Sequence, residues 1–445
     1  MDYKKYFKGK KITVIGLGLL GGAVNDTIFL AECGANLTVT DIKSSAELQP
    51  SLEKLETYSG IKYVLGGHKL EDFQNADMIL QPGNVSTDSI YLTEAGKNNI
   101  PIFVSESLFA KYVNSKVILV GVTGTRGKST VAQLIYEILV ASGQKVFLGG
   151  NVRDVSTLAL LQQVFVGDVV VMELDSWALH GMGDIKKSPH VAVFTTFFDD
   201  HLNFYKNDRD AYLDDKANIF KYQTEKDFLI LGSQCAELVK NKYSNIKSKV
   251  DVSNLYDISY KLKIPGEHNV YNASCAFHAT QALGISEKII KKTIENFKGA
   301  PGRLELVREK NEVRIYNDTT STTPEATIAG LKALGENKSI VLIAGGADKE
   351  LDMSEFANTI PKCCKTLILL SGTGTEKFVS EYGKDNELIR NAPVCDSLKE
   401  AVELAIKNAK NGDVVLLSPA FASFGMFKNE FDRGDQFNKL INNIQ

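Results

Sequence analysis

The chain has 445 residues, of which 44% are hydrophobic and 24% charged, and its formal net charge is -3. This length predicts about three domains with ample core, and the near balance of charge excludes a general polyanion-binding surface, so we expect no nucleic-acid partner. No apolar run is long enough to span a bilayer, so no membrane partner is expected. The six cysteines form no C-x-x-C pair, so no zinc ribbon is expected. The sequence shows no secretory signal, which together with these cysteines indicates a cytoplasmic protein.

The first predicted domain, residues 1–113, begins with a dinucleotide-binding pattern. A strand over 11–16 leads into the turn Gly16-Leu-Gly18-Leu-Leu-Gly21, a helix follows, and a second strand ends at Asp41. Such a turn lets a pyrophosphate approach the start of the helix, and an acidic residue about 20 positions further on can bind a ribose hydroxyl. NAD and a UDP-linked sugar both present these groups, and a glycine turn used only for close packing is the third interpretation.

Three further short strands are expected in this domain, at 61–65, 78–80 and 102–104. The middle one is followed by the turn Gln81-Pro-Gly83-Asn84. A Pro-Gly turn at the carboxyl end of a strand lies at the edge of an open α/β sheet where ligands gather.

The second predicted domain, residues 114–299, is organised around a glycine-rich turn. The apolar run 117–120 predicts a buried strand, Gly124 and Gly127 allow a tight turn, and Lys128 opens a helix. Helix-start amides bind phosphate, lysine neutralises its oxygens, and the following Ser129 can ligate Mg²⁺. The strict phosphate-loop pattern has glycine at 122, where this chain has Val122; the alternative is an ordinary strand-to-helix turn.

Two later strands of this domain end in possible metal ligands. The run 168–173 ends at Glu173, and the run 190–196 leads to Asp199-Asp200-His201. A carboxylate at such a strand end commonly holds Mg²⁺, and hard oxygens beside one imidazole suit Mg²⁺ or Mn²⁺ better than zinc. The Asp-Asp-His run is equally consistent with a surface loop.

Two helices follow. One over 214–219 carries Lys216, and one that begins near residue 264 carries Asn269 and Asn272 on the same face. Amide side chains can read an adenine edge, although Asn269 can instead cap its helix.

The third predicted domain, residues 300–445, follows a linker that ends at Arg303, a residue able to contact phosphate as a planar fork. A strand over 313–316 ends at Asn317-Asp318, and a run of hydroxyl residues before Pro324 predicts a helix start. Strands at 340–344, 366–370 and 414–417 alternate with helices, which predicts a third doubly wound sheet in an α/β chain.

Together these motifs resemble the Mur ligase family over nearly the whole chain. The most specific pieces are Gly124–Thr130, Glu173, Asp200-His201, Lys216, His268–Asn272, Asn317-Asp318, Leu417–Ala420, Phe427 and Arg433-Gly434. The resemblance implies three domains: a Rossmann-like N-terminal domain, a central P-loop ATPase domain with a mostly parallel sheet, and a C-terminal Rossmann-like domain. It also implies an ATP-dependent ligase, and the N-terminal glycine pattern favours the members that add D-glutamate or L-alanine.

The implied reaction joins D-glutamate to UDP-N-acetylmuramoyl-L-alanine through an acyl phosphate, with two Mg²⁺ ions for which Mn²⁺ can substitute. We expect a monomer that binds only these small molecules. The implied catalytic residues are Lys128, His201 and Lys216. The implied metal ligands are Ser129, Glu173, His201 and Lys216, the last as a carbamylated lysine. The implied ATP-binding residues are Gly124, Thr125, Gly127, Lys128, Ser129, Thr130, Asn269, Asn272, Arg303 and Asp318. The implied UDP-substrate residues are Gly16, Gly18, Leu19, Asp41, Gly83, Asn84, Asn151 and His201. The implied amino-acid-binding residues are Thr322, Lys349, Ser423 and Phe427.

Some positions depart from the family pattern. Asp175 replaces a serine beside the predicted metal site, and Thr320 replaces a lysine that would bear on amino-acid selectivity. The alternatives are another Mur-type ligase, a folylpolyglutamate synthase, a nicotinamide oxidoreductase that uses the Gly16 turn, and a P-loop switch protein.

Overall fold

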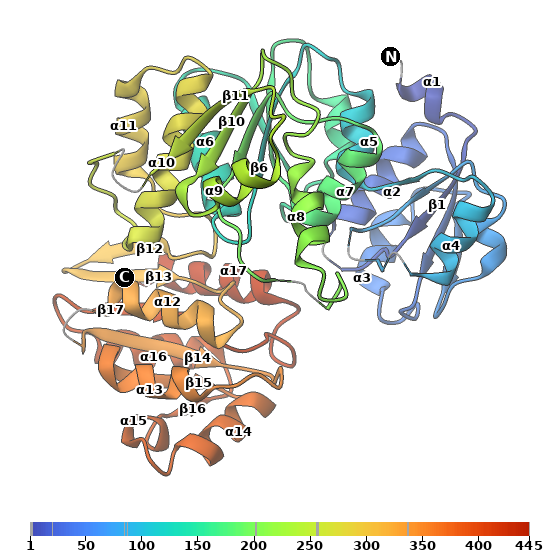
Figure 1. Cartoon of the computed structure of the whole chain (residues 1–445). Coiled ribbons are helices and arrows are strands. Elements are labelled where there is room, and N and C mark those ends of the chain that lie inside the picture. The colour runs from blue at the N-terminus through green and yellow to red at the C-terminus, as the bar shows by residue number, and fades with distance from the viewer. Residues whose placement is uncertain are drawn as a thin grey trace. The chain divides into compact units, whose positions relative to one another are not determined.

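The structure, a computed structural model, describes residues 3–19, 21–83, 85–86, 88–200, 203–254, 258–335 and 338–444. The chain folds into two compact units (Figure 1). The first unit comprises Met1–Ile258 and Tyr271–Thr293, and the second comprises Ser259–Val270 and Ile294–Gln445. Within the described residues the first unit holds two sheets and the second unit holds one.

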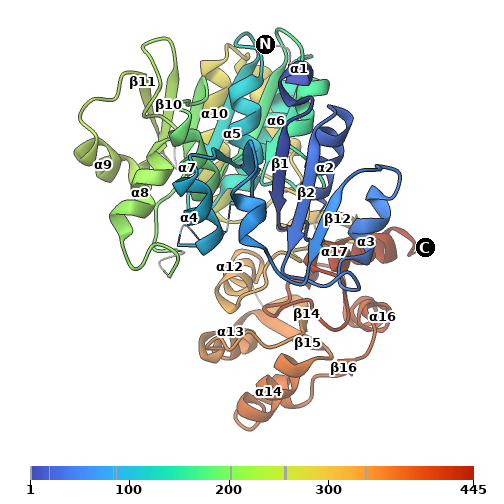
Figure 2. The same ribbon diagram turned by 90° about the vertical axis from the view of Figure 1, so that its right-hand side faces the viewer.

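The first sheet has the strand order β3-β2-β1-β4-β5, and all of its printed pairings are parallel. Figure 2 shows β1 beside β2 and α2. Because the order reverses between β2 and β4 around β1, the carboxyl end of β1 is the switch point where an open α/β sheet binds ligands. The strands are β1 Lys11–Ile15, β2 Asn36–Asp41, β3 Lys62–Leu65, β4 Met78–Leu80 and β5 Ile102–Phe103. The helices are α1 Tyr3–Phe7, α2 Gly22–Glu32, α3 Gln49–Leu52, α4 Ile90–Lys97 and α5 Ser105–Tyr112.

The second sheet has the order β11-β10-β9-β6-β8-β7 and is parallel throughout. The strand that precedes the glycine-rich turn, β6, lies between β8 and β9, so the carboxyl ends of these three strands meet. The strands are β6 Ile118–Thr123, β7 Val146–Gly150, β8 Val169–Glu173, β9 Val191–Phe194, β10 Phe228–Gly232 and β11 Lys249–Ser253. The helices are α6 Lys128–Ala141, α7 Ser176–Asp184, α8 Arg209–Ala217, α9 Ser233–Lys242, α10 Glu267–Ala282 and α11 Glu287–Asn296.

One hydrophobic core runs through both sheets of the first unit. It includes Val14 and Leu80 from the first sheet, and Val170 and Phe194 from the second. A buried side chain on α2 makes hydrogen bonds within this unit: Asp26 Oδ1 accepts from the hydroxyls of Ser105, at 2.9 Å, and Ser156, at 2.5 Å.

The second unit holds the sheet β12-β13-β17-β14-β15-β16, in which only the β12–β13 pairing is antiparallel. Separate hydrophobic clusters cover its two faces, one with α12 and α13 and the other with α16 and α17 (Figure 2). The strands are β12 Glu305–Lys310, β13 Val313–Asn317, β14 Ile340–Gly345, β15 Cys364–Leu370, β16 Val394–Cys395 and β17 Val414–Leu417. The helices are α12 Pro324–Leu334, α13 Ser354–Cys363, α14 Thr373–Tyr382, α15 Glu387–Arg390, α16 Leu398–Asn408 and α17 Glu430–Asn442.

The predicted α/β class with three largely parallel sheets is confirmed. All six cysteines are free thiols. Over the described part of the chain, no helix combines the length and the apolar character that crossing a membrane requires.

Candidate functional site

The glycine-rich turn at residues 124–127, here called the phosphate loop, has a backbone that only glycine fits at two positions. Gly124 has φ 145° and Gly127 has φ 90°, a region that L side chains avoid. A Cβ on Gly124 would lie 2.0 Å from Thr195 Oγ1, and one on Gly127 would lie 2.4 Å from Asn272 Oδ1. The loop therefore has its shape because neighbouring elements close around a bare backbone.

Residues at the end of β9 fasten the phosphate loop. Thr125 N donates to Thr196 O at 2.7 Å, and Arg126 N donates to Thr196 Oγ1 at 2.9 Å. Thr195 Oγ1 also donates to Arg126 O at 2.6 Å. Our sequence reasoning did not assign Thr195 or Thr196 to the site; the available signal was a pair of hydroxyl residues ending a strand beside the phosphate-loop strand.

Positive charge gathers at this loop. The helix α6 begins at Lys128 with no side-chain cap, so its first amides point outward and carry the positive end of the helix dipole. Lys128 Nζ donates to Gly124 O at 2.9 Å and to Thr125 O at 3.2 Å, which keeps the ammonium over the loop. Buried Thr130 lies in the first turn of the same helix. Amides and an ammonium converging on a bare loop suit a phosphate group.

Two oxygen donors meet beside the phosphate loop. Ser129 Oγ donates to Glu173 Oε1 at 2.9 Å, because β8 ends in register with β6, where Glu173 pairs with Val122. A hydroxyl and a carboxylate are hard oxygen ligands, so this pair fits Mg²⁺. His201 lies outside the described residues, and within them no group of three or more His, Cys, Asp or Glu side chains forms a metal cluster.

Lys216 is buried at the same place. Its side chain on α8 is 2% exposed, and its Nζ donates to Gly124 O at 3.1 Å, the oxygen that Lys128 also contacts. Its Nζ lies 4.9 Å from the ring centroid of Tyr212. Burial first, and then the charge of Lys128, lower the pKa of Lys216 to about 7, so a large fraction of the amine is neutral near physiological pH.

Asp175 follows Glu173 closely, but its carboxylate is engaged elsewhere. It is the N-cap of α7 and accepts a hydrogen bond from Ala178 N at 2.8 Å. Asn151, at the end of β7, donates its backbone N–H to Glu173 O at 2.8 Å, which places this predicted substrate residue next to the predicted metal carboxylate.

The N-terminal glycine turn is also stabilised internally. Gly16 and Gly18 have φ 70° and 56°, and Asp41 Oδ2 accepts from Gly18 N at 3.1 Å. Ser51, a residue that our sequence reasoning missed, donates its hydroxyl to Gly18 O at 2.6 Å. Leu19 is exposed. The predicted ribose ligand Asp41 therefore also orders the turn itself.

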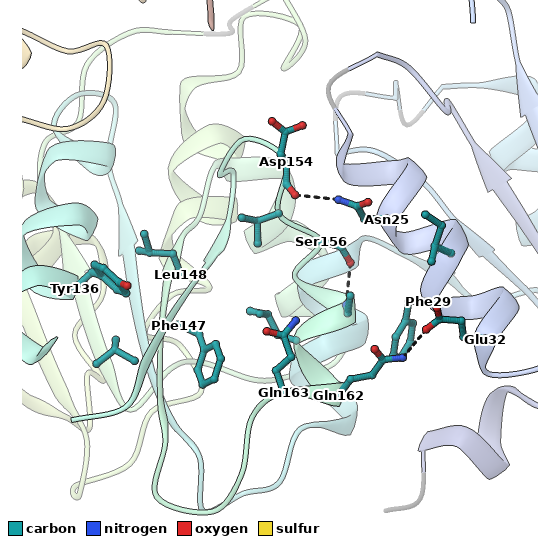
Figure 3. Close-up of a pocket in the computed structure, with 15 residues that line it drawn as sticks. Asn25, Phe29, Glu32, Tyr136, Phe147, Leu148, Asp154, Ser156, Gln162 and Gln163 are labelled. Atoms are coloured by element: carbon teal, nitrogen blue, oxygen red, sulfur yellow. Dashed lines mark hydrogen bonds between the residues drawn. The ribbon is translucent and has the colours of Figure 1, made fainter. Parts of the chain in front are cut away.

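A cavity of about 790 Å³ lies in the first unit and includes Gly83, Trp177 and Tyr205 in its lining. Gly83 is required there, because a Cβ would lie 2.7 Å from Trp177 Cβ. Its predicted neighbour Asn84 lies outside the described residues. A second cavity, of about 490 Å³, lies between α2 and β7 and is lined by none of the predicted site residues (Figure 3).

The predicted ATP-binding residues outside the phosphate loop are Asn269 and Asn272 of the second predicted domain and Arg303 and Asp318 of the third. Asn272 belongs to the first unit and touches the phosphate loop, as its closeness to Gly127 shows. Asn269 lies one turn earlier on the same helix, α10, and its Nδ2 donates to Pro265 O at 2.7 Å. Arg303 is exposed. Asp318 is buried and accepts from Ser418 Oγ at 2.7 Å, and burial raises its pKa to about 6.

The second unit brings the predicted amino-acid-binding residues into two contacting pairs. Lys349 Nζ donates to Thr322 Oγ1 at 2.9 Å, and Phe427 N donates to Ser423 O at 3.2 Å. Burial lowers the pKa of Lys349. Thr320, where the family pattern often has lysine, donates its hydroxyl to Gly302 O at 2.9 Å.

Residues 122–280 match the Mur ligase middle domain, and residues 302–421 match the Mur ligase, glutamate ligase domain. A UDP-N-acetylmuramoylalanine–D-glutamate ligase of Borreliella burgdorferi is 37% identical over 98% of this chain and 98% of its own length. One of Clostridium tetani is 32% identical over 100% of this chain and 99% of its own. The crystal structure of UDP-N-acetylmuramate-alanine ligase from Thermotoga maritima shares the fold, with a TM-score of 0.60, 18% identity and coverage of 97% and 99%.

Proposed function

The chain belongs to the Mur ligase family of ATP-dependent, amide-bond-forming ligases, and we propose that it adds D-glutamate to UDP-N-acetylmuramoyl-L-alanine in peptidoglycan precursor synthesis. The observation that carries the proposal is the identity of 36% and 37%, over 98% of the chain, with two relatives that bear the name of this reaction. Family membership leaves the nicotinamide oxidoreductase and the P-loop switch protein without support.

We assign one substrate to each predicted domain. Residues 1–113 bind the UDP portion at Gly16, Gly18 and Asp41, residues 114–299 bind ATP at the phosphate loop, and residues 300–445 bind the amino acid. The contacts of Asn269, Arg303 and Asp318 with the nucleotide stay predictions, as do those of His201 and Asn84.

The proposed chemistry has two steps. The L-alanyl carboxylate attacks the γ-phosphoryl group of ATP, which gives an acyl phosphate and ADP, and the D-glutamate amine then attacks the acyl carbon and expels phosphate. Phosphoryl transfer depends on positioning and charge neutralisation, which the α6 amides and Lys128 can supply. Mg²⁺ held by Ser129 and Glu173 would neutralise phosphate charge.

We further propose that Lys216 is carbamylated. A buried ammonium beside Lys128 is unfavourable and would repel a metal ion. A neutral amine can instead form an N–C bond with CO₂ and release a proton to solvent, which leaves a carbamate with a negative charge. The support is the burial of Lys216 together with its contact with the same loop oxygen as Lys128. The cytoplasmic location and the monomeric state stay predictions.

The proposal is tested by phosphate release from ATP with each substrate added alone and with both together. We expect release above background only when UDP-N-acetylmuramoyl-L-alanine and D-glutamate are both present, with formation of the amide product. Lys128→Ala should abolish it, whereas Lys145→Ala, which removes an exposed lysine paired with Asp168, should not. Release that responds instead to L-alanine, a folate or another acceptor would identify a different Mur-type ligase.

A further inference from the structure

The helix α17 carries a guanidinium that is fully enclosed. Arg433 is 0% exposed. Its Nε donates to Thr319 Oγ1 at 3.1 Å and its Nη2 to Thr319 O at 3.0 Å, both neutral acceptors. Its Nη1 has no hydrogen-bond partner.

This arrangement is costly for the fold. Burial of a charge is unfavourable unless a close ion pair compensates the lost hydration, and an unmade hydrogen bond adds to this cost. Burial accordingly lowers the pKa of Arg433 to about 10, and the Glu430 carboxylate only partly opposes this. A group with such a cost is expected where an anion arrives during function.

The surroundings of Arg433 are the predicted amino-acid-binding residues. Its guanidinium carbon lies 5.9 Å from the ring centroid of Phe427. The Arg433 charge also acts on Lys349. Burial lowers the pKa of Lys349, the Glu430 carboxylate opposes this shift, and the positive charge of Arg433 adds to it. Two cations and one carboxylate therefore act on one another here.

We propose that Arg433 is a positioning and specificity-determining residue of the amino-acid site. Its guanidinium, which contacts Phe427 and Thr319, supplies a second positive charge in addition to that of Lys349. A dicarboxylic amino acid needs this second charge. The inference rests on the proposed function and names a feature of its amino-acid site. A free dicarboxylic amino acid carries a net charge of about −1 at neutral pH, which balances the excess positive charge of the Lys349, Arg433 and Glu430 group. An amino acid with an uncharged side chain is neutral overall and leaves that excess in place.

Arg433 acts through its neighbours and does not itself contact the substrate, because its unpaired Nη1 is fully enclosed. The test must therefore separate its charge from its packing. Arg433→Met removes the charge, and Arg433→Lys keeps it. The matched control is Arg308→Met, because Arg308 Nη1 also holds α17, by donating to Ile441 O at 2.9 Å and Ile444 O at 2.6 Å.

The measurement is steady-state ligation with D-glutamate and with D-glutamine as acceptors, at saturating ATP and UDP-linked substrate, with thermal unfolding of each variant. For Arg433→Met we expect the KM for D-glutamate to rise about threefold to tenfold, because the lost charge acts at a distance and not through a direct hydrogen bond. The KM values for ATP and for the UDP-linked substrate should not change. The preference for D-glutamate over D-glutamine should fall by a similar factor, be largely kept in Arg433→Lys, and be unchanged in Arg308→Met.

Three results would overturn the proposal: an unchanged KM for D-glutamate in folded Arg433→Met, an equal loss with both acceptors, or a folded Arg433→Lys that loses preference for D-glutamate. If Arg433→Met does not fold, Arg433→Gln takes its place in the same comparison, because it also removes the charge but keeps an N–H donor for Thr319. Failure of the proposed function would appear differently, because the unaltered enzyme would then show no phosphate release that depends on D-glutamate.

Discussion

Replacement of Lys216 by alanine tests the centre of the proposed mechanism. The magnitude follows from the burial of this lysine, which lowers its pKa to about 7. At pH 8 roughly nine in ten such amines are neutral, against about three in a thousand for a lysine with an ordinary pKa. Since only the neutral amine adds CO₂, the reactive fraction of Lys216 exceeds that of a surface lysine by about two orders of magnitude.

The expected loss in Lys216→Ala is roughly a thousandfold in kcat, because a metal ligand of this kind accounts for several kcal/mol of transition-state stabilisation. A short carboxylate such as acetate should restore part of the activity. The matched control is Lys221→Ala. Lys221 lies just after the end of α8, and its Nζ donates to Asp214 O.

The assay for the modification is ¹³C NMR in labelled bicarbonate, run with activity measurements in CO₂-depleted buffer. We expect one bicarbonate-dependent carbamate resonance, lost in Lys216→Ala and kept in Lys221→Ala. The reasoning is refuted if no such resonance forms and full activity persists without CO₂, or if Lys216→Ala turns over at the normal rate.

The phosphate loop, the Ser129–Glu173 pair and the buried Asp26 can each be tested by a single substitution. Gly127→Ala should raise the KM for ATP about tenfold or more, because its Cβ would meet Asn272. The control is Gly143→Ala, which also has a positive φ, 85°, but has open space around it and should leave this KM unchanged. Equal effects of the two substitutions would contradict the role of Gly127. Ser129→Ala should raise the Mg²⁺ concentration for half-maximal activity about tenfold; an unchanged Mg²⁺ titration would argue against Ser129 as a ligand. Burial raises the pKa of Asp26 from 3.8 to about 6, so its protonated form stabilises the fold below about pH 4, and about 3 kcal/mol of that stability is lost as the pH rises through 6. In urea unfolding Asp26→Asn should flatten this slope, and a slope equal to that of the unaltered protein would exclude the assignment.

Local patterns were sufficient to predict the elements that carry the site. The apolar run before Gly121 is β6, the helix begins at Lys128 as expected, and β9 is parallel to β6. These features depend on side-chain period and on glycine conformations, which neighbouring residues determine. The strand β12 was missed because Glu305–Lys310 is charged, half-exposed and lacks a continuous apolar run; it forms because β13 offers it an antiparallel edge.

Long-range packing decides what the sequence could not show. A lysine is expected in solvent, and nothing near Lys216 in the chain indicates that it is enclosed beside Gly124. Likewise, the need for glycine at 124 and 127 comes from Thr195 and Asn272, which are distant in sequence. The resemblance supplied Arg433 as a motif residue, but only the structure shows that one of its N–H groups is unpaired.

The continuous core of the first unit limits how this protein can be divided. Apolar side chains from Phe7 to Val239 belong to one cluster. A fragment that ends at residue 113 would expose apolar core side chains to water and should aggregate on expression. Recombination between relatives should therefore succeed when the first two sheets are exchanged as one block. A crossover between the two sheets would require matched substitutions among the core side chains that each sheet contributes.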